Sequence, residues 1–344
     1  MKKSKIIYEI IAFLLTAALT VTGLLHIGNA LLPKHYDFGS VWDTYQNEEE
    51  NSLDVLFFGS SLCYCDIVPA QIYLDSGIRS FVNGGSYQTL AVTRQYLDES
   101  LKTQTPSVVL LELTGAFYDR YTDYSILNVI YMPSGLPRLR AAFACEEQAR
   151  LAAVFPLYES HERIFQPAEE RQEDPQTEQE HAFFASMRAG YTFRDERNPQ
   201  TVSERSFTAV PGTETYENNL ASIRSIAACC EKNGIELVMY FAPCMERVPQ
   251  DLRQQLFADL LDVPCAAIED WTELGEQLGI DNSTDWYDSL HMNAYGAAKF
   301  SAFLADYLVQ LGVCPLSAEP SKLWEDRAVW WQQNSELYHF LPQQ

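Results

Sequence analysis

A pair of serines directly follows a short apolar run that has the character of a buried strand. The run covers residues 54–58 and is followed by Gly59-Ser60-Ser61. A parallel sheet binds ligands at the carboxyl ends of its strands, and a serine on such a turn lies exposed beside backbone N–H groups. The pattern therefore favours Ser61 as a candidate nucleophile. By itself, the pattern is more often a turn whose serine caps the next helix.

A second pattern places an acid three residues ahead of a histidine, at Asp288 and His291. At this spacing the carboxylate can fold back onto the imidazole, fix its tautomer and stabilise the imidazolium that forms in acyl transfer. The alternative is a capped helix start with a solvated histidine. Position favours His291, because the remaining histidines lie in or beside an apolar N-terminal segment, in a polar middle segment or in the tail; they are His26, His35, His161, His181 and His339.

Strands that alternate with helices must position these residues. Apolar runs predict strands at residues 54–58, 80–83, 107–113, 235–241 and 265–268. Helical spacing predicts helices at residues 90–102, 216–233, 249–261 and 294–311. This alternation predicts an α/β fold, a three-layer α/β/α sandwich with a mostly parallel sheet, over a domain at residues 53–314.

The alternation is interrupted between residues 116 and 212, which we interpret as a cap-like insert. Within it, residues 169–180 are charged and Gln-rich and contain Pro175, so we expect a mobile surface loop there. Residues 315–344 form a Trp-rich C-terminal tail that could close over the core or over the side near the membrane.

The N-terminus has the features of a membrane anchor. Lys2, Lys3 and Lys5 precede residues 10–33, which carry no formal charge. Such a segment can cross a hydrocarbon core of about 30 Å, and its basic flank predicts that residues 1–5 stay in the cytoplasm. We therefore expect a single-pass signal-anchor at residues 6–33, a spacer at 34–52 and an extracytoplasmic domain. A cleaved signal peptide and a buried core helix are the alternatives.

Charge and cysteine content limit the possible partners. The chain has 24 Lys+Arg and 47 Asp+Glu, a formal net charge of -23, which disfavours binding to nucleic acid or to anionic lipid surfaces. None of the eight cysteines has zinc-ligand spacing, so no metal site is expected. Cys63 and Cys65, close to the serine pair, leave a cysteine enzyme as a disfavoured alternative.

The serine and histidine patterns together resemble the SGNH/GDSL hydrolase superfamily over most of residues 54–311. The first motif of that family is Gly-Asp-Ser, so its nucleophile falls on Ser61, and Ser60 replaces the usual aspartate. The second motif supplies a glycine N–H to the oxyanion hole, and its best match at residues 81–88 implies Gly84, with Gly85 as a rival. The last motif matches Asp288 and His291; the family-like residues that follow are Asn293, Gly296 and Phe300.

The third motif departs from the family. Where the family has Gly-x-Asn-Asp, this chain reads Glu112-Leu113-Thr114-Gly115-Ala116-Phe117 and offers no asparagine. The loss of one oxyanion donor typically lowers the rate about 10²–10³-fold. Glu112 either takes another role or caps the strand.

These departures and the N-terminal anchor look like a membrane-tethered branch of the superfamily, which includes the D-alanyl lipoteichoic acid transfer protein and proteins that acetylate exported polysaccharides. The resemblance implies a serine esterase or O-acyltransferase without cofactor, acting on acyl esters, foremost acetyl esters, of cell-surface glycans. A membrane-bound acyl-donor partner is compatible with it. The alternative is an accessory or binding protein of an envelope acylation system that keeps the fold and has lost efficient turnover.

Overall fold

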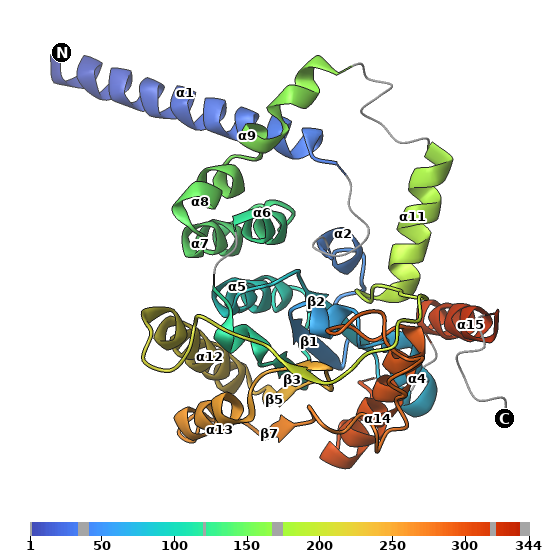
Figure 1. Ribbon diagram of the computed structural model, residues 1–344. Helices are drawn as coiled ribbons and strands as arrows, with labels where there is room; N and C mark the ends of the chain where they lie inside the picture. Colours follow the sequence, from blue (N-terminus) through green and yellow to red (C-terminus); the bar gives the residue numbers. More distant parts are fainter. Residues whose placement is uncertain (1, 34–40, 120–121, 167–174, 317–320, 338–344) are drawn as a thin grey trace.

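A parallel five-stranded sheet forms the centre of the protein. The computed structural model describes residues 2–33, 41–119, 122–166, 175–316 and 321–337 (Figure 1). The strands are β1 (Val55–Gly59), β2 (Ser80–Gly84), β3 (Val108–Glu112), β5 (Glu236–Phe241) and β7 (Ala267–Asp270). Their order is β2-β1-β3-β5-β7 and all neighbours pair in parallel. The chain thus crosses from β1 to β2 on one side and then returns to β3 on the other side of β1. This reversal places a topological switch point between β1 and β3.

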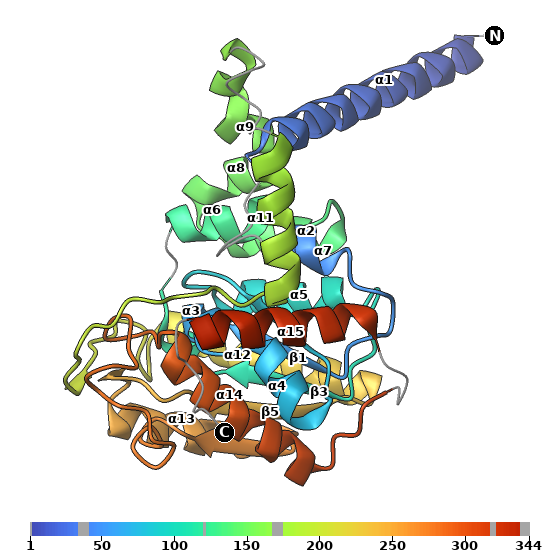
Figure 2. The same cartoon turned by 90° about the vertical axis from the view of Figure 1, so that its right-hand side faces the viewer.

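Successive side chains of each strand enter two separate cores. In β1, Leu56 and Phe58 belong to one buried cluster, and Val55 and Phe57 belong to the other. The first cluster includes α5 (Leu90–Ser100), α12 (Glu214–Asn233) and α13 (Gln250–Asp259); the second includes α4 (Pro69–Ser76), α14 (Ala294–Leu311) and α15 (Lys322–Leu337). The helices lie on both sides of the sheet (Figures 1 and 2). The predicted three-layer α/β fold is confirmed.

Two long helices show why their boundaries were readable from the sequence. The helix predicted at 294–311 is α14, which begins after Asn293, whose side chain accepts hydrogen bonds from the N–H groups of Tyr295 and Gly296. It ends at Gly312, whose φ of 90° suits glycine. The helix predicted at 216–233 begins two residues earlier, because the Thr213 side chain caps it by accepting from Tyr216 N–H.

The middle of the chain forms a helical layer on the outer side of α5. It consists of α6 (Thr122–Ile130), α7 (Leu136–Ala144), α8 (Glu147–Val154), α9 (Pro156–Ser160) and η2 (His161–Phe165). α7 packs on α5, and α9 packs on the end of α1 (Lys2–Leu31), as Figure 1 shows. A methyl group on Gly28 of α1 would lie only 2.5 Å from the Leu157 nitrogen, so the two helices are in close contact.

The prediction of a mobile loop at residues 169–180 was in part wrong. Residues 175–180 form the first turns of α11 (Pro175–Arg188), while residues 169–174 lie outside the described chain. Pro175 stands at the first helical position, where its missing N–H costs nothing. Gln176 and Glu180 then bond at i,i+4 spacing. A polar composition was therefore compatible with a surface helix.

Helix α1 extends away from the rest of the molecule (Figure 2). Its segment Lys5–Leu31 is long and apolar enough to cross a membrane. The following α2 (Trp42–Tyr45) lies within the predicted spacer, yet Trp42 and Tyr45 are buried in the core.

The C-terminal segment is held by a buried ion pair. Arg327 of α15 donates two hydrogen bonds to the Glu48 carboxylate, and both side chains are almost fully buried. The neighbouring Trp331 donates from Nε1 to Gln71 Oε1 at 2.7 Å. The tail thus covers α4 and contributes to both cores, through Trp324 to the first and through Trp331 to the second.

Replacement of Arg327 by methionine should lower the free energy of unfolding by about 3–5 kcal/mol, because it leaves the Glu48 carboxylate buried without its partner. Lys322→Met is the control, because the Lys322–Asp326 pair on the same helix is exposed and should leave stability unchanged. Chemical denaturation of the full chain in detergent measures both. Equal stability of the Arg327 variant and the parent would contradict this account.

Candidate active site

Ser61 lies at the carboxyl end of β1, beside the switch point of the sheet. β1 ends at Gly59, and Ser61 begins the short helix α3 (Ser61–Tyr64). Ser60 is the residue that caps this helix, since its hydroxyl accepts from Leu62 N–H at 3.4 Å. The two interpretations of the serine pair therefore apply to different residues. Ser60 serves the turn, and the hydroxyl of the half-buried Ser61 is available to another partner.

That partner is His291. Its Nε2 lies 2.7 Å from Ser61 Oγ, and its Nδ1 lies 2.9 Å from Asp288 Oδ2. An ionised carboxylate only accepts hydrogen bonds, so Nδ1 carries the proton and Nε2 is left to accept the proton of the Ser61 hydroxyl. The three residues singled out in the sequence thus form one continuous hydrogen-bonded relay.

Asp288 is fixed by its own loop. Its Oδ1 accepts the N–H groups of Leu290 and His291, each at 2.8 Å, while Oδ2 faces the imidazole. Burial raises the pKa of Asp288, but the hydrogen bond and charge of His291 and the two backbone N–H groups outweigh it and lower the pKa below its usual value. The carboxylate is therefore ionised over the range in which an imidazole base works.

A buried carboxyl that the sequence gave no reason to single out ties the histidine loop to the serine turn. Asp66, just after α3, accepts Met292 N–H at 2.9 Å on Oδ1. Burial raises its pKa well above the usual range. β6 (Glu246–Arg247) holds the loop from the other side, because Glu246 N–H donates to the Ser289 carbonyl at 2.7 Å. Only the fold reveals Asp66, because its partner lies 226 residues away.

Gly84, one of the two candidate oxyanion glycines, lies beside the serine turn. Gly84 ends β2 and pairs in register with Gly59 of β1. A methyl group here would lie 3.1 Å from the Ser60 carbonyl oxygen, so the backbone of β2 closely approaches the serine turn. Gly85 N–H already donates to the Gly59 carbonyl at 3.2 Å. Ser61 N–H, at the first position of α3, has no partner within its helix.

Glu112, the first residue of the segment 112–117, bonds both the serine turn and the turn that follows β3. It ends β3, and its Oε1 accepts Thr114 N–H at 2.7 Å, which caps the short helix η1 (Thr114–Phe117). Its Oε2 accepts the Ser60 hydroxyl at 3.3 Å. Burial raises the pKa of Glu112 to about 7, against the opposing effect of these hydrogen bonds. A titratable group therefore lies directly behind the serine turn.

Two buried asparagines brace the loops around the site. Asn128 of α6 donates to the Ser86 carbonyl at 2.9 Å, and Asn219 of α12 donates to the carbonyls of Ala116 and Tyr118 at 3.0 Å. The Tyr118 hydroxyl in turn donates to Ser60 Oγ at 3.2 Å. The insert thus supports the β2–α5 turn through Asn128, a role that no local motif signals.

The nearby cysteines are poor nucleophiles. Cys63 and Cys65 are fully buried, and burial raises the pKa of both thiols above the usual value. The thiolate is the reactive form, so this environment disfavours a cysteine enzyme. Among the described residues all eight cysteines are free thiols, and no cluster of three His, Cys, Asp or Glu side chains is placed to hold a metal ion.

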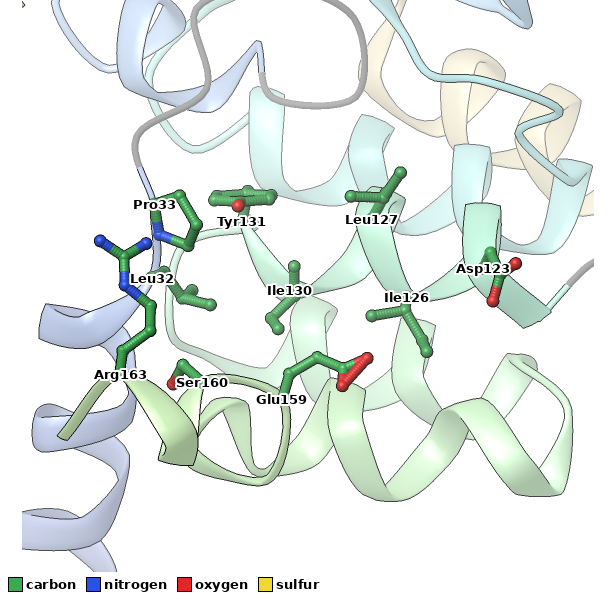
Figure 3. Close-up of a pocket in the computed structure, with 10 residues that line it drawn as sticks. All are labelled: Leu32, Pro33, Asp123, Ile126, Leu127, Ile130, Tyr131, Glu159, Ser160 and Arg163. Carbon is green, nitrogen blue, oxygen red and sulfur yellow. The ribbon is translucent and has the colours of Figure 1, made fainter. Parts of the chain in front are cut away.

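A cavity of about 390 Å³ lies elsewhere, between the end of α1, α6 and α9 (Figure 3). Leu32, Ile126, Ile130 and Tyr131 contribute its apolar wall, and Arg163 lies at one end. None of the predicted site residues lines it. The cavity and the serine relay are separate features.

Comparison with known proteins finds similarity among solved structures. No protein-family model and no curated protein sequence matches the chain. The crystal structure of a candidate acylhydrolase from Bacteroides fragilis is similar, with a TM-score of 0.38 and 9% sequence identity. The match covers 81% of this chain and 99% of that chain.

Glu112 should make stability depend on pH. Its pKa is raised from 4.5 to about 7 in the folded chain. Its contribution to the free energy of unfolding is therefore complete below the pKa of the unfolded chain and is lost as the pH rises through about 7. A shift of this size corresponds to about 3 kcal/mol at most. Between about pH 5 and about pH 8, Glu112→Gln should therefore reduce the loss of unfolding free energy seen in the parent. Denaturation at several pH values measures this, with the exposed Glu231→Gln as control, and parallel curves for parent and Glu112→Gln would contradict it.

Proposed function

We propose that the chain is a membrane-anchored, extracytoplasmic serine esterase or O-acyltransferase of the SGNH/GDSL type. The observation that carries the proposal is the relay from Ser61 Oγ through His291 to Asp288 at the carboxyl edge of the sheet. A hydroxyl next to a histidine base that a carboxylate orients is the arrangement needed for acyl transfer.

In the proposed mechanism, His291 Nε2 takes the proton of the Ser61 hydroxyl while Oγ attacks the ester carbonyl. The N–H groups of Ser61 and Gly84 stabilise the oxyanion. As the tetrahedral intermediate collapses, the imidazolium returns its proton to the leaving alcohol and the acyl group stays on Ser61. Water or a sugar hydroxyl, deprotonated by the same imidazole, then releases it. Hydrolysis and transfer share every step except the identity of this last nucleophile.

The proposed substrate is an acyl ester of a cell-surface glycan, foremost an acetyl ester. The support is the apolar α1 together with the resemblance to the membrane-tethered branch of the family. The basic N-terminus favours an exported domain. For transfer, an acyl donor is needed, and the anchor favours a membrane-bound donor partner.

The missing asparagine of the third motif supports a second candidate function. With one donor fewer, the chain would be an accessory protein that binds acylated glycan without efficient turnover. The two functions differ in cells, because Ser61→Ala should abolish glycan acylation or deacylation only if the chain is the enzyme.

A fluorophosphonate probe tests the activated serine. The full chain in detergent should gain one probe adduct by intact mass, whereas Ser61→Ala should gain none and His291→Ala should label at least about 10³ times more slowly, because the base is lost. Ser222→Ala is the matched control, since Ser222 is half-buried on α12, as Ser61 is on α3, and its hydroxyl donates to the Asn218 carbonyl. Undiminished labelling of Ser61→Ala, or no labelling of the folded parent, would contradict the catalytic proposal.

On an acetyl ester of 4-nitrophenol, Asp288→Asn should lower kcat roughly 10⁴-fold, because the amide no longer holds the productive tautomer of His291. The KM should change little, because Asp288 does not contact the substrate in the proposed mechanism. Steady-state kinetics of parent and variant measure both constants. An Asp288→Asn enzyme with the kcat of the parent would exclude the relay as the source of activity.

A further inference from the structure

A caged arginine lies beside the serine turn. Arg205, which follows the short strand β4 (Ser203–Glu204), is half-buried, and its guanidinium carbon lies 5.2 Å from the Tyr87 ring centre, 5.6 Å from Tyr118 and 5.3 Å from Phe207. Its guanidinium donates a hydrogen bond to the Tyr87 hydroxyl at 3.0 Å. The Glu246 carboxylate acts on its charge from a distance, and no ion pair joins the two side chains in the described part of the chain.

The two tyrosines of this cage connect it to the proposed catalytic residues. Tyr118 donates to Ser60, the chain neighbour of Ser61, at 3.2 Å. Tyr87 is three residues beyond Gly84, on the turn that Asn128 braces. β4 pairs with β6, and β6 holds the histidine loop at Ser289. Arg205 is therefore positioned from the serine side, the glycine side and the histidine side at once.

The backbone of Tyr87 shows that this placement is held against a local cost. Its φ is 44°, in the left-handed region that a tyrosine rarely adopts. Its ring also packs against Tyr124, which is 38% exposed, with the ring centres 4.9 Å apart. Strained residues that the surrounding structure fixes in place are typical of ligand sites.

We propose that Arg205, with Tyr87 and Tyr118, forms a subsite for an anionic group, a carboxylate or a phosphate, on the alcohol part of the ester that Ser61 attacks. A planar guanidinium presents several N–H donors that match such groups, and the aromatic cage restricts its motion and limits its hydration. That the bound molecule is an ester attacked by Ser61 rests on the proposed function. The binding of an anionic group at Arg205 does not depend on it. The net charge of -23 opposes long polyanions, so the subsite is expected to select a single anionic sugar unit.

Binding is tested without turnover, on the full-length Ser61→Ala chain in detergent. Singly O-acetylated glucuronic acid, glucose 6-phosphate and singly O-acetylated glucose are titrated by ligand-observed NMR; the first two separate a carboxylate from a phosphate source. At least one anionic sugar should bind about tenfold more tightly than the neutral one, the effect of a charged hydrogen bond. Adding Arg205→Gln should bring the ratio to within about twofold.

Two further variants make the outcome specific. Arg205→Lys keeps the positive charge but loses the planar guanidinium, which can donate two hydrogen bonds to one anionic group. This variant should therefore keep only part of the preference for anionic sugars. Arg224→Gln removes an arginine on α12 that pairs with Asp262, and should keep all of it. Equal binding of anionic and neutral sugars, a preference that survives Arg205→Gln, or one that Arg224→Gln also abolishes would overturn the subsite. A parent that lacks fluorophosphonate labelling but shows the Arg205-dependent preference would refute only the catalytic proposal, and the reverse result would refute only the subsite.

Discussion

The hydrogen bonds of one imidazole bring together two ends of the domain. His291 bonds Ser61, 230 residues earlier in the chain, and Asp288, three residues earlier. Such a contact requires the end of β1 and the loop after β7 to meet at one edge, although β3 and β5 separate these strands in the sheet. Asp66 secures the meeting by accepting Met292 N–H. The sheet, the crossovers and the capped start of α14 together hold Ser61 and His291 in contact.

A strongly acidic chain has to place carboxyl groups where their charge is tolerated, and the site shows two ways of doing so. Asp288 is stabilised as an anion by His291 and two backbone N–H groups. Asp66 and Glu112 are buried, and burial raises the pKa of both. Their proximity would otherwise oppose the ionised Asp288. Arg205 then contributes a local positive charge beside the same turn, in a protein that is negative as a whole.

Local patterns predicted most of the fold and both short motifs of the site, because strand hydrophobicity, helix caps and the Asp-x-x-His spacing lie within short segments. The helix at 294–311 and the Ser60-Ser61 turn are examples. Asp66, Asn128 and Arg205 could not be found in this way, since their roles arise from partners distant in sequence. The expected loop at 169–180 failed for a different reason: composition does not distinguish a polar loop from a polar surface helix, and residues 175–180 form such a helix.

The central claim is that Ser61 carries the acyl group during the reaction, and the most direct measurement is to trap that intermediate. The full chain in detergent is mixed rapidly with an activated acetyl ester, quenched in acid and mapped by peptide mass spectrometry. The account predicts the mass of one acetyl group on the peptide containing Ser61, removable by hydroxylamine. Acetylation of another residue, or turnover with no acetyl group on Ser61 at any quench time, would contradict it.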